Sequence, residues 1–253
     1  MEPGRWLVTP RPRPNAQVRL LCLPFAGGAA SAYRAWGDLM GDDVEVTAVQ
    51  LPGREMRLRE PPFDRVGPLV TALADMLEAV SDGRPFAVFG HSMGALIGFE
   101  LVRELRRRGR TLPVALVASG RNAPHLPARD PLMHPLPDDE FVARLREFEG
   151  TPEAVLEHEE LMRLLIPLLR ADFAVNEAYD HTPEAPLDLP LLAMGGTDDP
   201  EVSREGLEAW SAYTSGPFDL RIYPGGHFFL TPLAREVTGA VRQAIRGAMR
   251  LPV

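Results

Sequence analysis

Apolar segments of strand length alternate with amphipathic helical patterns along this sequence, and this alternation constrains the fold more than any other feature. It is typical of a mostly parallel sheet covered by helices. Apolar residues at three- and four-residue spacing predict a helix over 66–80, and a second helix is predicted over 93–108. The 253 residues suffice for one large domain, so we predict a single α/β domain over residues 1–253. Its predicted strands are 18–23, 44–49, 86–89, 114–118, 189–194 and 218–223.

The alternation is interrupted once, at about 121–187, where no strand is predicted. This segment contains two helical patterns, at 137–149 and 158–179. So long a connection in a compact domain is usually a functional insertion with its own structure. Two interpretations are open: a helical pair that caps the sheet, or a lid over a site at the carboxyl ends of the strands. The second pattern presents an apolar stripe, formed by Leu161, Leu164, Leu165, Leu168 and Phe173.

The composition excludes several classes of function. All 27 basic residues are arginine, which rules out Schiff-base chemistry and the lysine of a phosphate-binding loop. The single cysteine, Cys22, excludes an internal disulfide and a multi-cysteine metal site. A net charge of −8 disfavours nonspecific binding to nucleic acid or an anionic membrane. Because no apolar run reaches the roughly 18 residues of a membrane span, and no secretory signal is recognised, we expect a cytoplasmic protein.

The segment Gly90-His91-Ser92-Met93-Gly94 matches the Gly-x-Ser-x-Gly nucleophile elbow. The pattern alone also fits a glycine-bearing turn. Its context favours the elbow, because a predicted strand leads in and a predicted helix leads out, as this strand-turn-helix requires. Side chains at positions 90 and 94 would crowd the backbone around a serine held in strained geometry. We therefore predict Ser92 as a nucleophile.

A serine hydroxyl needs a base to become nucleophilic, and that base needs a carboxylate to orient it. His227 follows the last predicted strand on a glycine-rich loop, where an α/β-hydrolase places its base. The alternative for His227 is a turn histidine packed by aromatic side chains. Asp199 and Asp198 follow the strand at 189–194, and the Gly-x-x-Asp-Pro spacing favours Asp199. The order serine, aspartate, histidine is that of the hydrolase fold.

Attack on an acyl carbonyl also requires donors for the developing oxyanion. One predicted donor is the backbone amide of Met93, the residue after the nucleophile. The loop after the first strand supplies the other, from Ala26 or, as the next choice, Phe25. Its glycines, Gly27 and Gly28, would equally fit a tight turn or a phosphate loop. No Gly-x-Gly-x-x-Gly or Walker pattern completes a nucleotide site, however.

Five segments spread over nearly the whole chain match one family of hydrolases. Among them, Leu51-Pro52-Gly53-Arg54-Glu55 is not a general hydrolase feature, so the match is specific. The segments resemble the type II thioesterases, stand-alone editing hydrolases that accompany polyketide synthases and nonribosomal peptide synthetases. They are 23–28, 50–57, 89–94, 170–173 and 224–229.

The resemblance implies an α/β-hydrolase that releases acyl groups from the phosphopantetheine arm of an acyl or peptidyl carrier protein. Ser92 would attack the thioester, His227 would take its proton and later activate water, and Asp199 would orient His227. Such enzymes use no metal or cofactor. We expect a monomer with no nucleic-acid or membrane partner. The insertion would be the lid, and its apolar face would line the acyl chamber, with Leu164, Leu165, Leu168 and Phe173.

Three other functions remain open: a chain-releasing thioesterase, a general carboxylesterase of the same fold, and a noncatalytic protein on a hydrolase scaffold. The last would usually lack one member of the triad, and none is missing here. The two enzymes differ from an editing thioesterase in what they release and in their preference between esters and thioesters.

An acidic carrier protein would be repelled by a chain of net charge −8 unless its docking face is locally basic. Arg57 and Arg59 follow the strand at 44–49, whose carboxyl end lies at the edge where active sites of this architecture gather. We therefore predict that they receive the carrier, the alternative being a solvated arginine face. For Arg54, an internal pair with a lid carboxylate is the alternative.

Overall fold

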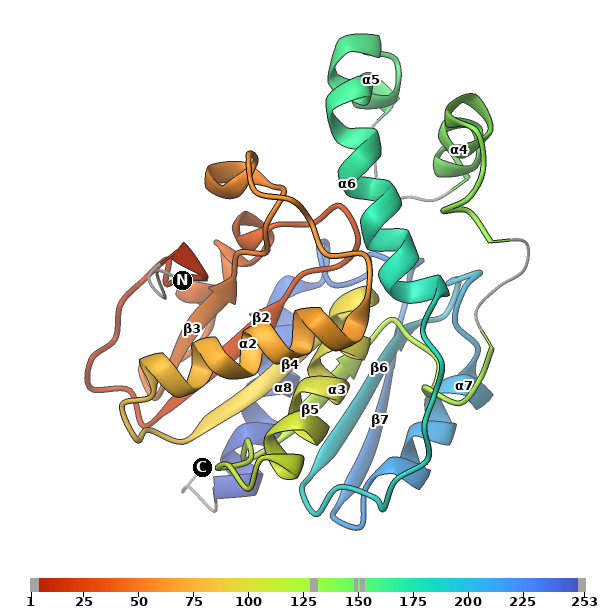
Figure 1. The fold of residues 1–253 in the computed structure, drawn as a ribbon. Helices are drawn as coiled ribbons and strands as arrows, with labels where there is room; N and C mark the ends of the chain where they lie inside the picture. Colours follow the sequence, from red (N-terminus) through yellow and green to blue (C-terminus); the bar gives the residue numbers. More distant parts are fainter. Residues whose placement is uncertain (1–4, 128–131, 148–149, 151–152, 250–253) are drawn as a thin grey trace.

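The computed structural model describes residues 5–127, 132–147, 150 and 153–249, and within them one seven-stranded sheet forms the centre of the molecule (Figure 1). The strand order is β1-β3-β2-β4-β5-β6-β7. Neighbouring strands are parallel except β1 and β3, which are antiparallel. The mostly parallel sheet is therefore confirmed. The strands are β1 Leu7–Val8, β2 Val18–Leu23, β3 Val44–Val49, β4 Phe86–His91, β5 Leu116–Ser119, β6 Leu191–Gly196 and β7 Phe218–Tyr223.

Six of these strands agree with the sequence prediction, and β2, β3 and β7 agree at both ends. β4 continues two residues further, to His91, and so reaches the predicted elbow. β6 begins at Leu191 instead of at residue 189, since Pro190 has no backbone N–H to donate to the sheet. β5 begins at Leu116, two residues later than predicted. β1 was not predicted because two residues are too few to show an alternating pattern.

Helices cover both faces of the sheet (Figure 1). The predicted helices are present as α2 and α3, which pack against each other on one face. On the other face α1 packs against α8, and neither of these helices was predicted. A further helix, α7, follows β6. These elements span α1 Trp36–Leu39, α2 Val66–Val80, α3 Met93–Arg107, α7 Arg204–Glu208 and α8 Ala234–Met249.

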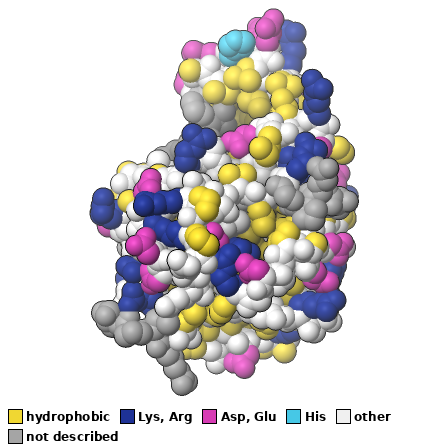
Figure 2. All heavy atoms as spheres, turned by 90° about the vertical axis from the view of Figure 1, so that its left-hand side faces the viewer, with side chains coloured by type: hydrophobic (Ala, Val, Ile, Leu, Met, Phe, Trp, Pro, Cys, Tyr) yellow, Lys and Arg dark blue, Asp and Glu magenta, His cyan; other side chains and the backbone are white. Residues whose placement is uncertain are grey.

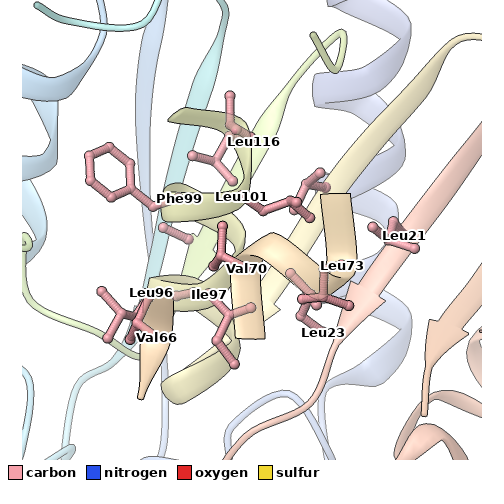
Figure 3. Close-up of a cluster of buried hydrophobic side chains, with 14 of the residues drawn as sticks. Leu21, Leu23, Val66, Val70, Leu73, Leu96, Ile97, Phe99, Leu101 and Leu116 are labelled. Carbon is pink, nitrogen blue, oxygen red and sulfur yellow. The ribbon is translucent and has the colours of Figure 1, made fainter. Parts of the chain in front are cut away.

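The core is divided by the sheet into two layers. Alternate residues of β2 enter different layers: Leu21 and Leu23 pack with α2 and α3, whereas Leu20 and Cys22 pack on the side of α1 and α8. Figure 3 shows the first layer, in which side chains of α2 and α3 meet those of the strands. Strands buried on both faces in this way hold the carboxyl ends of β2, β4 and β6 in fixed positions.

The described part of the insertion forms three helices, which stand beyond the carboxyl ends of the strands (Figure 1). Its two predicted helices are α4 and α6, although 148–149 of the first pattern lie outside the described residues. The insertion has a small apolar core of its own, which includes Phe141, Leu145, Met162 and Ile166. None of the described helices combines the length and hydropathy that a membrane span requires. The three helices are α4 Asp138–Leu145, α5 Glu153–Leu156 and α6 Glu159–Glu177.

Candidate active site

Ser92 lies in the turn between β4 and α3, in a backbone conformation that few residues other than glycine adopt. Its φ is 55° and its ψ is −116°. A Cβ at Gly90 would overlap the Gly94 carbonyl, and a Cβ at Gly94 would overlap the backbone of Leu23. The two glycines therefore let the turn close against itself and against β2. Such strain at one serine is typical of a functional position.

His227 and Asp199 meet on adjacent loops after β7 and β6. The His227 Nδ1 and Asp199 Oδ2 atoms are 2.7 Å apart, and the Asp199 side chain is fully buried. Asp199 Oδ1 accepts a second hydrogen bond, from the Glu201 amide at 2.9 Å. Asp198 is exposed and its carboxylate instead accepts from the Thr197 hydroxyl at 3.1 Å. Of the two candidate acids, the structure thus brings Asp199 against His227.

Backbone hydrogen bonds fasten these two loops together. The amide of Thr197 donates to Tyr223, and the amide of Asp198 donates to Gly225. Gly196 permits this approach, because a Cβ there would overlap the carbonyls of Gly225 and Gly226. The loop hydrogen bonds turn Asp198 outward, which leaves the next residue facing the histidine.

Ser92 and His227 line the same cavity, of about 250 Å³, beneath the lid. Phe25 and Ala26, from the loop after β2, form part of its wall, and Met93 is buried at the start of α3. The predicted nucleophile, base and oxyanion loop therefore surround one space. The insertion contributes lining residues that include Met133, Leu145, Leu169, Phe173 and Asn176.

His91, next to Ser92 in the sequence, is buried and contacts Ser119, so it is not a candidate for the base. Its Nδ1 lies 2.9 Å from the Ser119 hydroxyl, and its ring packs against Phe25, Phe228 and His227. Burial lowers the pKa of the His91 imidazole well below its usual value, and the nearby His227 lowers it further. His91 is therefore neutral near pH 7.

The predicted lining of the acyl chamber is wrong for most of α6. Phe173 lines the cavity, but Leu164, Leu165 and Leu168 are not among its lining residues in the described part of the chain. Leu164 is 53% exposed, Leu165 packs on the core of the insertion, and Leu168 approaches Gly53. The cavity-lining positions of α6 are Leu169, Phe173, Asn176 and Glu177, on a different face of the helix from Leu164 and Leu165.

The predicted docking role is also wrong for Arg57. Its side chain is buried, with the guanidinium 4.0 Å from the centre of a Trp6 ring and 2.6 Å from Glu60. It also donates to the Gln50 carbonyl at 2.9 Å. Arg57 therefore holds the segment after β3 against Trp6 of the N-terminal segment, and its side chain is not accessible to a partner. Arg59 is exposed and remains available.

A buried ion pair joins the lid to the oxyanion loop. Arg54 and Asp172 of α6 make two hydrogen bonds, of 2.7 and 2.9 Å, and their side chains are 5% and 2% exposed. Asp172 Oδ2 also accepts from the Gly27 amide at 2.7 Å, and Arg54 donates to the Gly28 carbonyl at 2.8 Å. Burial raises the pKa of the Asp172 carboxyl, while Arg54 opposes that rise.

The sequence suggested that Arg54 could pair with an acidic side chain of the insertion, but it did not show which one. The pair spans 118 residues, so no local spacing could reveal it. The only signal was that both residues lie in segments of the family resemblance. Among the described residues, no cluster of three or more histidine, cysteine, aspartate or glutamate side chains is arranged to hold a metal ion.

Comparison with known proteins decides the family. The model of the family described as "Thioesterase domain" matches residues 18–245. The chain belongs to the thioesterase family. It is 42% identical to the gramicidin S biosynthesis protein GrsT of Aneurinibacillus migulanus, over 90% of this chain and 88% of that protein. It is 40% identical to thioesterase PikA5 of Streptomyces venezuelae, over 94% of this chain and 84% of that protein.

Two solved structures of thioesterases superpose closely on the fold. The type II thioesterase BorB from the borrelidin biosynthetic cluster has a TM-score of 0.86 and 39% identity, covering 96% of this chain and 98% of BorB. RedJ, a thioesterase from the prodiginine pathway in Streptomyces coelicolor, has a TM-score of 0.87 and 41% identity, covering 94% of each chain. The resemblance to type II thioesterases and the α/β-hydrolase fold are thereby confirmed, and the chain is a thioester hydrolase.

Replacing Asp199 and replacing Asp198 should have very different effects on thioester hydrolysis. Asp199→Asn removes the charge that faces His227 Nδ1, so kcat/KM should fall by about 10³- to 10⁴-fold. Asp198→Asn, the matched control, should change it by less than about threefold, since its carboxylate contacts only Thr197 among the described residues. Steady-state hydrolysis of an acyl-pantetheine thioester measures both. Equal losses would contradict the geometry of this loop.

Removing one partner of the ion pair between Arg54 and Asp172 should destabilise the protein strongly. Asp172→Asn leaves a buried guanidinium without its counter-charge, which should lower the free energy of unfolding by about 3–5 kcal/mol. Asp138→Asn breaks another arginine pair of the insertion, with Arg170, but Asp138 is 71% exposed. That control should cost less than about 1 kcal/mol. Denaturant unfolding compares them, and similar losses would show that the burial of Asp172 has no energetic consequence.

Proposed function

We propose that this thioesterase is an editing enzyme that hydrolyses acyl thioesters from the phosphopantetheine arm of acyl or peptidyl carrier proteins. The observation that carries the proposal is that Ser92 and His227 face one cavity, with Asp199 bound to the far nitrogen of His227. The family provides thioester hydrolysis, and the named relatives belong to gramicidin, borrelidin and prodiginine biosynthesis. A free-standing hydrolase in such a pathway would clear carriers that bear stalled or wrong units.

The catalytic steps follow from the positions of these groups. With Nδ1 held by Asp199, His227 has Nε2 to accept the Ser92 proton as the hydroxyl oxygen attacks the thioester carbonyl. The amides of Met93 and Ala26 would stabilise the oxyanion. The intermediate collapses, the carbon–sulfur bond breaks, and His227 returns its proton to the pantetheine thiolate. Water then attacks the Ser92 ester with His227 as base, which releases the acid and restores the serine.

The size of the cavity is compatible with the short acyl units that an editing enzyme would remove. Its volume of about 250 Å³ lies below the range of about 300–1,000 Å³ that is usual for sites of drug-sized ligands. Short acyl units, such as a mischarged carrier bears, would fit within it. A full-length product chain would have to extend beyond the lid.

Loss of the nucleophile should abolish release without unfolding the protein. Ser92→Ala should reduce hydrolysis of acyl-carrier substrates by at least about 10³-fold and leave Tm within a few degrees. Mass spectrometry of the carrier follows the loss of the acyl group, with a panel of acyl units from two to eight carbons. A mutant that retains substantial activity would contradict the elbow assignment. A wild-type enzyme that hydrolyses simple esters faster than matched thioesters would favour a general carboxylesterase.

Carrier docking is proposed at the exposed segment that contains Arg59. Met56 and Leu58 on the same segment are 66% and 43% exposed, so an arginine lies next to apolar surface. Figure 2 shows the face that carries this segment, where arginine and hydrophobic side chains lie among acidic ones. Arg59 would offer a positive charge to an acidic carrier, next to apolar surface that docking could cover.

Charge reversal at Arg59 should therefore affect carrier substrates selectively. Arg59→Glu should raise KM for an acyl carrier several-fold at low salt, with a much smaller change for the same acyl group on free pantetheine. Arg110→Glu is a control. Arg110 follows the end of α3 that lies away from Ser92, and its side chain is 55% exposed. Equal effects of Arg59→Glu on both substrates would indicate a structural role, and no effect would place docking elsewhere.

A further inference from the structure

The wall of the cavity contains an arginine without a carboxylate partner among the described residues. Arg121 follows β5 and lines the same cavity as Ser92. Its Nη1 donates to the amide oxygen of Asn176 at 2.7 Å, and its backbone carbonyl accepts from the Trp210 ring at 2.8 Å. Its Nε is buried and has no hydrogen-bond partner within the described part of the chain. The guanidinium therefore has N–H donors, including Nε, that no described residue accepts from.

Other charged groups of the cavity wall are engaged elsewhere. Arg144 donates to Glu147 at 2.6 Å. Glu177 accepts from the amides of Met133 and His134 and contacts the His134 ring at 2.6 Å. Arg121 differs from Arg144 because its described side-chain partner is a neutral amide. Among the described residues no carboxylate is paired with the Arg121 guanidinium, although Glu201 also lines the cavity.

This charge persists at neutral pH. Burial lowers the pKa of Arg121 to about 10, which is still well above 7. A guanidinium that loses hydration without gaining an ion pair is destabilised, and a ligand oxygen would supply a hydrogen bond in place of the lost water. Uncompensated charges in a cleft are accordingly candidates for ligand recognition.

We propose that Arg121 binds an oxygen acceptor on the acyl chain, a carboxylate or a carbonyl, while the thioester lies at Ser92. The inference rests on the proposed function, since it requires the acyl group to occupy this cavity. Asn176 and the Trp210 contact fix the arginine in place, and its planar fork matches a carboxylate or carbonyl oxygen. Leu145, Leu169 and Phe173 surround the intervening methylenes. The enzyme would then select oxygenated acyl chains over saturated chains of equal length.

Three pantetheine thioesters of six-carbon acids test this selection: hexanoyl, 5-oxohexanoyl and adipoyl with a free terminal carboxylate. For the wild type, kcat/KM for the two oxygenated chains should exceed that for hexanoyl by about tenfold or more, since a hydrogen bond to a charged group discriminates to that extent. In Arg121→Met this ratio should fall toward one. Arg121→Lys keeps the positive charge but lacks the planar guanidinium. It should retain part of the preference for adipoyl, whose carboxylate is attracted by the charge, and lose the preference for 5-oxohexanoyl, whose carbonyl is neutral.

Binding measured without turnover separates recognition from catalysis. In the Ser92→Ala background, adipoyl-pantetheine should bind about tenfold more tightly than hexanoyl-pantetheine, and adding Arg121→Met should remove the difference. Similar kcat/KM values for all three chains in the wild type, or equal losses on all three in Arg121→Met, would overturn the inference and leave the proposed function intact. Failure of the wild type to hydrolyse any carrier- or pantetheine-bound thioester would instead contradict the proposed function.

Discussion

The close approach of backbone at the turn between β4 and α3 is the constraint on which the rest of the site depends. Gly90 and Gly94 contact each other, and Gly94 also lies against the backbone of Leu23, so β4, α3 and β2 meet with no side chain between them. Ser92 is held at a positive φ by this contact. Because the loop after β2 begins at the same point, one packing arrangement places Ser92 and that loop together. The parallel sheet then brings the loops after β6 and β7 to the same edge.

The lid is tied to this centre by charge and not only by apolar contact. Arg54 and Asp172 are buried together, and the carboxylate also holds the amide of Gly27. A shift of α6 would thus move the loop that carries Ala26. The cavity wall shows the opposite electrostatic arrangement, since Arg121 is charged and has no described carboxylate partner. Arg54 is therefore paired within the fold, whereas we propose that Arg121, which is only partly buried, is available to a ligand in the cavity.

Sequence periodicity predicted the parts of the fold in which burial follows a simple pattern. Strands buried on both faces and the stripe of α2 are of this kind. Ser92, Asp199 and His227 could be proposed from the sequence because their motifs depend on short, local spacing. The face of α6 could not be predicted in the same way. This helix packs apolar residues both into the core of the insertion and toward the cavity, so an apolar stripe alone does not say which face lines the site. The docking role predicted for Arg57 was wrong for another reason. Its guanidinium contacts Trp6, Gln50 and Glu60, and no linear pattern shows these contacts.

The central claim is that hydrolysis proceeds through an acyl group carried on Ser92, and trapping that intermediate tests it most directly. The enzyme would be mixed with an acyl-pantetheine thioester, quenched in acid within milliseconds, and analysed by mass spectrometry of the intact chain and its peptides. The account predicts a transient mass increase equal to one acyl group, located on the peptide that contains Ser92. Hydrolysis without any such adduct, or with the acyl group on another residue, would contradict it.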